Sequence, residues 1–127
     1  MLSEKNTILI VEDEQPILNA LALKLTHEGF SVLTATDGEE GLAIALKKRP
    51  DLLLLDILLP KIDGLDVMRR IRETTWGKSV PIILLTNLSP DDKITKQIVE
   101  DQPAYYLVKA DWKLEDIVHK IHEALTE

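Results

Sequence analysis

Residues 52–64 read LLLLDILLPKIDG, and the fold class is most clearly visible in this segment. Four consecutive leucines predict a strand that is buried on both faces, because a strand with one face in water would alternate apolar and polar residues. The apolar run stops at Asp56, and Pro60 and Gly64 frame a turn into an amphipathic segment from Leu65 to Ile71. A buried strand that leads through a short turn into a helix is the building unit of a parallel sheet covered by helices.

The same unit is repeated along the chain on both sides of this stretch. Asp37-Gly38 is expected to begin the second helix, and Pro90 with Asp91 and Asp92 to form the first turn of the fourth. The predicted fold class is α/β, with a parallel sheet. Strands are expected at residues 8–11, 31–35, 52–55, 81–85 and 105–108, and helices at 17–25, 41–46, 65–71, 94–99 and 114–125.

The length and the lack of cysteine limit the possible classes of protein. The chain has 127 residues, which predicts one domain over residues 1–127 and no output domain in the chain. With no cysteine, disulfides, thiolate catalysis and cysteine-ligated metals are excluded. Any metal must therefore be held by oxygen or imidazole.

Charge and hydropathy narrow the choice of partners. The net charge of −7, with both signs scattered along the chain, leaves no basic stripe for direct nucleic-acid binding. The N-terminus is short and polar, and no apolar run approaches the ~20 residues that a membrane helix needs. These features predict a cytoplasmic protein without membrane insertion.

Polar side chains follow the predicted strands unevenly: the second strand, expected at the far edge, ends only in Thr36 and Asp37, and the other four strands end in the remaining candidates. In an open parallel sheet, ligands bind at the carboxyl ends of the strands, so these residues are the candidate site. If the four strands are neighbours, several carboxylates, a hydroxyl and an ammonium group converge in one crevice. The residues are Glu12, Asp13 and Glu14 after the first strand, Asp56 after the third, Thr86 and Asn87 after the fourth, and Lys109 after the fifth.

The residue types at these strand ends indicate phosphoryl chemistry. Clustered carboxylates repel one another and either raise a pKa or recruit a cation. With oxygen ligands in an open site, Mg2+ fits better than zinc, because it keeps waters and is completed by a phosphate. Lys109 then supplies a point charge to one phosphate oxygen, and Thr86 a hydrogen bond to another. Asp56 is the candidate nucleophile, and the set predicts phosphoryl transfer onto Asp56.

Four motifs resemble those of the receiver domain of bacterial two-component response regulators, and the resemblance covers essentially the whole chain. ILIVEDE at residues 8–14 is similar to the acidic motif of that family. Residues 52–64 are similar to its phosphoacceptor strand, with Pro60 and Gly64 following Asp56 at the family's spacing. IILLT at 82–86 resembles the strand of the switch threonine, and YLVK at 106–109 the strand with the switch aromatic and the lysine. The chain resembles the single-domain, chemotaxis-regulator type of the family.

The resemblance implies a particular sheet and a particular metal site. The sheet would be flavodoxin-like, with five parallel strands in the order 2-1-3-4-5 and helices on both faces. Asp13 and Asp56 would ligate Mg2+ directly and Glu12 through water, while the backbone carbonyl of Leu58 would complete the protein ligands.

The activity implied by the resemblance is signalling rather than turnover of an external substrate. A sensor histidine kinase or a phosphotransfer protein would donate a phosphoryl group to Asp56, and the chain would catalyse only its own phosphorylation and dephosphorylation. Lys109 and Thr86 would assist the transfer, and the modified state would shift a two-state equilibrium that involves Thr86 and Tyr106. Tyr106 is preferred to Tyr105 through the family position, with ordinary packing as the alternative. The fourth helix, fifth strand and fifth helix would form the face that binds a downstream effector protein.

Some positions depart from the family pattern. Ala110 follows Lys109 where the family usually has proline after a cis bond, which opens the loop to a trans bond and to a different position of the lysine. Asn87 stands where a small residue is usual and would narrow access for a phosphodonor. Leu58 and Leu88 flank the site and have no group to orient a hydrolytic water, which predicts a changed lifetime of the phosphoryl group.

Three other functions remain open at this point. The main alternative is a degenerate receiver that serves as a phosphorylation-independent protein-interaction module, which Glu12, Asn87 and Ala110 favour and an acidic pocket with Lys109 disfavours. A flavin-binding module would need a phosphate-cradling loop after the first strand. A phosphatase would need an acid or base where Leu58 stands.

Overall fold

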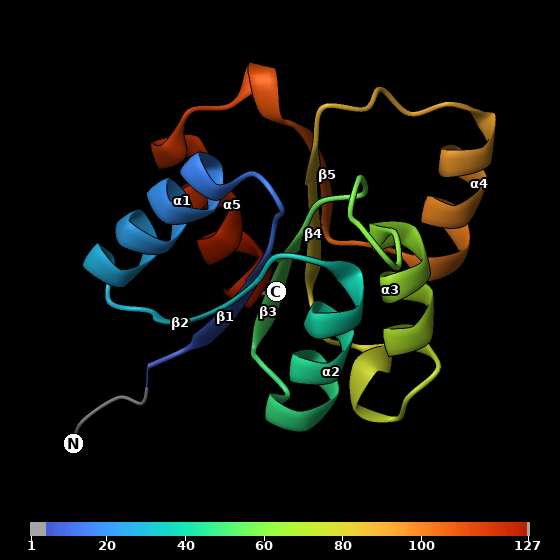
Figure 1. Cartoon of the computed structure of the whole chain (residues 1–127), viewed down its shortest axis with the longest axis horizontal. Helices are drawn as coiled ribbons and strands as arrows, with labels where there is room; N and C mark the ends of the chain where they lie inside the picture. Colours follow the sequence, from blue (N-terminus) through green and yellow to red (C-terminus); the bar gives the residue numbers. More distant parts are fainter. Residues whose placement is uncertain (1–4, 127) are drawn as a thin grey trace.

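The computed structural model describes residues 5–126 and has the α/β architecture expected from the sequence (Figure 1). None of the helices within these residues has the length and apolar character needed to span a bilayer. The strands are β1 (Thr7–Val11), β2 (Ser31–Ala35), β3 (Leu52–Leu55), β4 (Ile82–Thr86) and β5 (Tyr105–Val108). The helices are α1 (Gln15–His27), α2 (Gly38–Lys48), α3 (Gly64–Arg72), α4 (Asp92–Asp101) and α5 (Leu114–Thr126), with two short 3-10 helices, η1 (Trp76–Lys78) and η2 (Lys109–Asp111).

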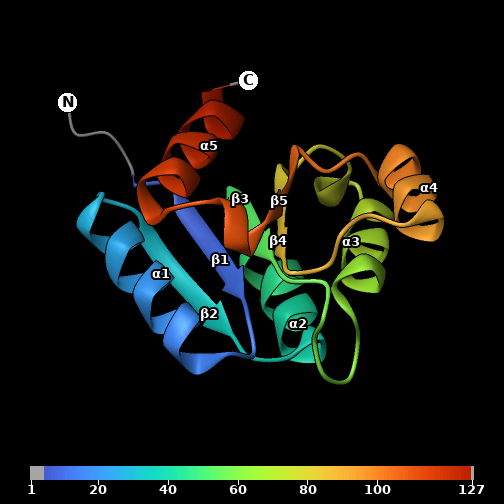
Figure 2. The same cartoon turned by 90° about the horizontal axis from the view of Figure 1, so that it is seen from above.

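The sheet is parallel throughout, in the order β2-β1-β3-β4-β5, which confirms the implied topology. Figure 2 shows α1 and α5 on one face of the sheet and α2, α3 and α4 on the other. The chain therefore leaves β1 toward one face and leaves the neighbouring strand β3 toward the opposite face. Such a divergence opens a crevice at the carboxyl ends of the two strands.

The leucine run forms the centre of the core. Leu52 and Leu54 belong to the apolar cluster between the sheet and helices α1 and α5. Leu53 and Leu55 belong to the cluster between the sheet and helices α2 to α4. All four side chains are at most 1% exposed. Successive side chains of a strand point to opposite faces, so a strand that is covered on both faces has no position for a polar residue.

Some element boundaries differ from the sequence-based expectation. The expectation that Pro90 lies in the first turn of α4 is wrong, because the helix begins one residue after Asp91, whose side chain accepts a hydrogen bond from the amide of Ile94 at 2.8 Å. Asp91 is thus the N-cap, and Pro90 precedes it. At the other end of α4, Gln102 adopts a positive φ of 48° and its amide donates to the carbonyl of Ile98.

Gly64 brings the start of α3 against the turn that follows β3. Its amide donates to the carbonyl of Ile57 at 2.8 Å, and a Cβ on Gly64 would lie 2.0 Å from the carbonyl oxygen of Asp56. We expect Gly64→Ala to lower the free energy of unfolding by about 3 kcal/mol, because the clash is with backbone and cannot relax by a side-chain rotation. Urea unfolding measures the loss.

Gly29→Ala is the matched control for this prediction. Gly29 has a φ of +94°, but an added Cβ would meet no atom within 4 Å, so its cost is conformational strain alone, about 1 kcal/mol. Equal losses in the two variants would contradict a steric role for Gly64.

Candidate functional site

The hydrogen bonds of the sheet place two acidic strand ends next to each other. Val11 of β1 lies opposite Leu55 of β3 in the parallel register. The amide of Asp56 still donates to the carbonyl of Val11 at 3.1 Å, and the amide of Glu12 donates to the carbonyl of Ala35 at 3.0 Å. The first residues beyond β1 and β3 are therefore held by the sheet itself.

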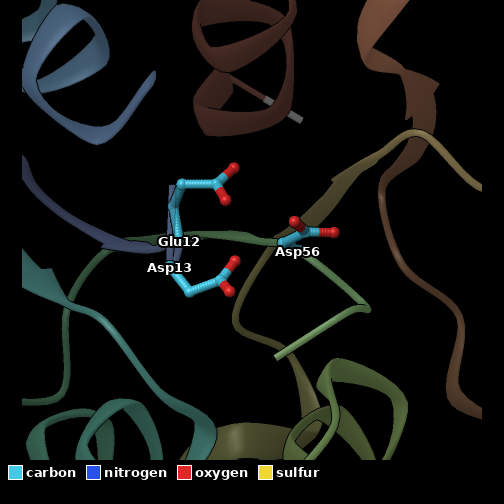
Figure 3. Close-up of side chains that lie close together, drawn as sticks. All are labelled: Glu12, Asp13 and Asp56. Carbon is cyan, nitrogen blue, oxygen red and sulfur yellow. The ribbon is translucent and has the colours of Figure 1, made fainter. Parts of the chain in front are cut away.

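Glu12, Asp13 and Asp56 form an acidic cluster at this edge. One carboxylate oxygen from each residue lies within 4.8 Å of those of the other two. Figure 3 shows the side chains of Glu12 and Asp13 leaving the end of β1 with both carboxylates on the side of Asp56. Glu12 is 2% exposed and Asp56 4% exposed, whereas Asp13 is exposed. Three convergent carboxylates, one of them open to solvent, are a suitable donor set for a hard divalent cation such as Mg2+.

Lys109 reaches this cluster from just beyond the end of β5, which lies two strands away from β3. Its Nζ lies 2.5 Å from Oε1 of Glu12, 2.9 Å from Oδ2 of Asp56 and 3.5 Å from Oε1 of Glu14. The side chain of Lys109 is only 9% exposed. The bond between Lys109 and Ala110 is trans, and the lysine nevertheless enters the acidic site. The sequence analysis placed Glu14 among the residues of the crevice but did not predict its ion pair with Lys109.

Burial and pairing shift the pKa values of two of these groups. Burial is the largest influence on Glu12 and raises the pKa of its carboxyl, against the hydrogen bond from Lys109, which lowers it. Burial alone would lower the pKa of the Lys109 ammonium group, but its hydrogen bonds to Glu12 and Asp56 outweigh burial and raise this pKa. Lys109 is therefore a permanent positive charge at neutral pH.

The raised pKa of Glu12 predicts a pH-dependent loss of stability in metal-free protein. The unfolded chain releases this proton near the ordinary pKa of 4.5, before the folded chain does, so the free energy of unfolding falls as the pH rises from there toward the folded pKa. Glu12→Gln has no such proton, and we expect its unfolding free energy to depend less on pH in this window. Urea unfolding with a chelator between about pH 4.5 and 7 measures the effect. Glu39→Gln, at an exposed position of α2, is the control, and parallel curves for wild type and Glu12→Gln would contradict the prediction.

Thr86 and Tyr106 lie beside the acidic site rather than in it. Thr86 is fully buried at the end of β4, and its hydroxyl oxygen accepts a hydrogen bond from the amide of Leu88 at 3.4 Å. The hydroxyl of Tyr106 donates to the carbonyl of Leu88 at 2.7 Å. Burial, followed by the charges of Asp91 and Asp56, raises the pKa of the Tyr106 phenol, which therefore stays a donor at neutral pH. Both side chains thus hold the loop between β4 and α4.

The site opens to solvent through a small hollow of about 210 Å³. Leu58 and Asn87, singled out as departures from the family pattern, are both among its lining residues, and Leu58 is 56% exposed. The amide of Leu58 donates to Oδ1 of Asp56 at 3.2 Å, which orients that carboxylate. The hollow is lined by Asp13, Glu14, Asp56, Leu58, Asn87 and Lys109.

Comparison with known proteins identifies the class to which this fold and site belong. A family model described as the response regulator receiver domain matches residues 8–122. The chain therefore belongs to the family of response regulator receiver domains, which are signalling modules of two-component systems.

Individual relatives agree with this assignment. The chain is 41% identical over 125 residues to the uncharacterized transcriptional regulatory protein YkoG of Bacillus subtilis (strain 168). This alignment covers 98% of this chain and 53% of that protein. It spans about half the length of the curated relatives it matches. Among solved structures, a CheY-like receiver domain protein from Methanospirillum hungatei JF-1 superposes with a TM-score of 0.89 at 26% identity, covering 97% of this chain and 95% of that one.

One solved relative carries a metal ion. The receiver domain of sensor histidine kinase PA1611 from Pseudomonas aeruginosa PAO1, with magnesium coordinated in its active site cleft, has a TM-score of 0.86 and 27% identity. The comparison covers 98% of this chain and all of that one (100%).

Proposed function

We propose that the chain accepts a phosphoryl group on Asp56 in a Mg2+-dependent reaction, from a phosphohistidine of a sensor histidine kinase or a phosphotransfer protein. The observation that carries the proposal is the position of Asp56, buried at the end of β3 between two carboxylates and the ammonium group of Lys109. A phosphoryl acceptor must bring negative charges together, so it needs both a cation site and a fixed positive charge beside the nucleophile. The acidic cluster and Lys109 supply these two features.

Four groups would hold the Mg2+ ion. We assign Asp13, Asp56 and the backbone carbonyl of Leu58 as direct ligands, and Glu12 as a ligand through water. When bound, the ion neutralises the carboxylates and the phosphoryl oxygens. The magnesium site of the PA1611 receiver domain supports this assignment.

The transfer itself uses few protein groups. A carboxylate oxygen of Asp56 attacks the phosphorus atom, and the P–N bond of the phosphohistidine breaks as the O–P bond forms. The imidazole leaves with the electron pair of the broken bond and takes up a proton. Lys109 exchanges its contact with Asp56 for one with a phosphoryl oxygen, and the Thr86 hydroxyl donates a hydrogen bond to another phosphoryl oxygen.

The readout is the surface formed by α4, β5 and α5. We assign Thr86 and Tyr106 to the switch, because both bond to Leu88 in the loop that leads into α4. When Thr86 turns toward the phosphoryl group it gives up its bond with the Leu88 amide, and the loop can then take a second arrangement. Residues 1–127 act in this proposal as one receiver unit that presents this surface to a downstream effector.

Binding of a phosphoryl analogue tests the proposal. In the presence of Mg2+, beryllium fluoride should raise the free energy of unfolding by about 2.7 kcal/mol at a hundredfold excess over its dissociation constant. The measurement is urea unfolding with Mg2+ alone and with both reagents. A folded protein that gains nothing from beryllium fluoride would support the phosphorylation-independent interaction module instead.

The exposed Leu58 predicts a long-lived phosphoryl group. A leucine at the mouth of the site has no polar atom to orient an attacking water, whereas an asparagine at that position can donate or accept one hydrogen bond. We expect Leu58→Asn to speed loss of the phosphoryl group by about threefold to tenfold, the worth of one such bond. The decay of the phosphorylated protein after removal of the donor measures the rate. Leu23→Asn, at an exposed leucine of α1, is the control, and an unchanged rate in Leu58→Asn would refute the prediction.

A further inference from the structure

We propose that Trp112 is a positioning residue for Lys109. The proposal rests on the phosphoacceptor function proposed above and adds the group that keeps its lysine in place. Lys109 stands at a junction in the chain, because β5 ends at Val108 and the 3-10 helix η2 begins with Lys109 itself. The direction in which its side chain leaves the backbone therefore depends on the segment that follows.

Trp112 closes the turn that follows Lys109. Its amide donates to the carbonyl of Lys109 at 3.4 Å, and its half-buried side chain packs on the apolar cluster between the sheet and helices α1 and α5. Trp112 and Lys109 line the same apolar hollow of about 320 Å³, together with Ile17, Leu85 and Ile117. Lys109 thus has its ammonium group among carboxylates and its carbon chain beside an apolar hollow that Trp112 helps to enclose.

The Trp112 ring belongs to a set of contacting side chains that we name the β5–α5 clasp. The clasp comprises Tyr105, Trp112, Lys120 and Glu123. Nζ of Lys120 lies 4.6 Å from the centroid of the Tyr105 ring and 5.7 Å from that of the Trp112 ring. Oε2 of Glu123 accepts from Lys120 at 3.3 Å and from the Tyr105 hydroxyl at 2.9 Å. The clasp joins the strand before Lys109 to the helix after it, and so fixes the short connection between them.

A displaced Lys109 would weaken the binding of one ligand of the site and not that of the other. Its ammonium group contacts Glu12 and Asp56, the same carboxylates that are assigned to Mg2+. If the lysine moves away, these carboxylates bind Mg2+ at least as tightly. A phosphoryl analogue on Asp56 instead needs the positive charge of Lys109 and binds more weakly. If Trp112 served only the stability of the fold, its removal would lower the affinities for both ligands together, because both ligands need the folded crevice.

The experiment measures both affinities in the full chain by titration calorimetry, with Mg2+ alone and with beryllium fluoride at saturating Mg2+. In Trp112→Ala we expect the beryllium fluoride affinity to fall about tenfold, with the Mg2+ affinity unchanged or higher. Lys120→Met, which keeps the ring and removes the charge beside it, should lower the beryllium fluoride affinity about threefold. Trp112→Phe should restore nearly wild-type values, and Trp76→Phe, at the tryptophan of η1, is the matched control.

The outcomes separate this proposal from the one on which it rests. A beryllium fluoride affinity in Trp112→Ala within about twofold of wild type, or equal losses for both ligands, would overturn the positioning role. If Trp112→Ala does not fold, the same comparison of beryllium fluoride and Mg2+ affinities in Lys120→Met tests the positioning role. A wild-type protein that binds Mg2+ but no beryllium fluoride would contradict the phosphoacceptor function itself.

Discussion

Asp56→Asn should accept no phosphoryl group from acetyl phosphate under conditions in which the wild-type protein gains a single adduct. The amide has no charged oxygen to attack phosphorus, and it cannot form the acyl phosphate that a carboxylate forms. We expect neither of the other two carboxylates of the cluster to substitute. Asp13 forms no ion pair with Lys109 among residues 5–126, and Glu12, although paired with Lys109, does not line the hollow through which the site opens to solvent. The intact mass of the protein over time measures the adduct.

The control for this variant is Asp51→Asn. Asp51 lies just before β3 and Asp56 just after it, so the two substitutions make the same chemical change at opposite ends of one strand. Asp51 accepts a hydrogen bond from the amide of Thr7 at 2.7 Å, which an asparagine oxygen can also accept. Asp51→Asn should therefore be phosphorylated at the wild-type rate. An adduct of undiminished yield on Asp56→Asn would place the acceptor elsewhere.

Lys109→Met should have two large effects. Without Mg2+ the free energy of unfolding should fall by about 3 kcal/mol, because Glu12 and Asp56 would then be buried beside each other with no positive charge to compensate them. Added Mg2+ should stabilise this variant more than it stabilises the wild type, since it takes over the neutralisation. The rate of phosphorylation at saturating Mg2+ should fall by about a hundredfold, as expected for the loss of one fixed charge on the transferred group.

Urea unfolding with and without Mg2+ tests the first effect, and the time course of the adduct tests the second. Lys113→Met, at an exposed lysine four residues further along the chain, is the matched control. If Lys109→Met is as stable as the wild type without Mg2+, the ion pairs of Lys109 do not compensate the buried carboxylates. If it is phosphorylated at the wild-type rate, Lys109 has no part in the transfer.

The main features of the fold follow from patterns that are local in the sequence. The leucine run at 52–55 indicates a strand that is covered on both faces, and the polar residues after each apolar run indicate the edge at which the site forms. These patterns are decisive because a two-sided core admits no polar residue, while a strand end in a crevice admits several. Proline does not define where a helix begins, as Pro90 before α4 shows, because it is compatible with positions both inside and just before a first helical turn.

The finer geometry of the site depends on contacts between residues that are distant in the chain. The sequence brings Glu14 and Lys109 to one crevice but does not show that they form an ion pair, since they are 95 positions apart and an exposed end of an acidic run is equally consistent with the start of a helix. Neither could it assemble the β5–α5 clasp, whose cation–π contacts depend on how α5 packs on β5. The trans bond after Lys109 was left open by the sequence, and the structure shows that the lysine reaches Asp56 with it.

The position of the phosphoryl group on the chain shows whether Asp56 is the acceptor. After incubation with acetyl phosphate and Mg2+, borohydride reduces an acyl phosphate of aspartate to homoserine, and the mass of the corresponding peptide then identifies the residue. If Asp56 is the Mg2+-dependent acceptor, homoserine forms at position 56 alone, and none forms when Mg2+ is removed by a chelator before the donor is added. Homoserine at another position, or its absence from folded protein that has been given both Mg2+ and donor, would contradict it.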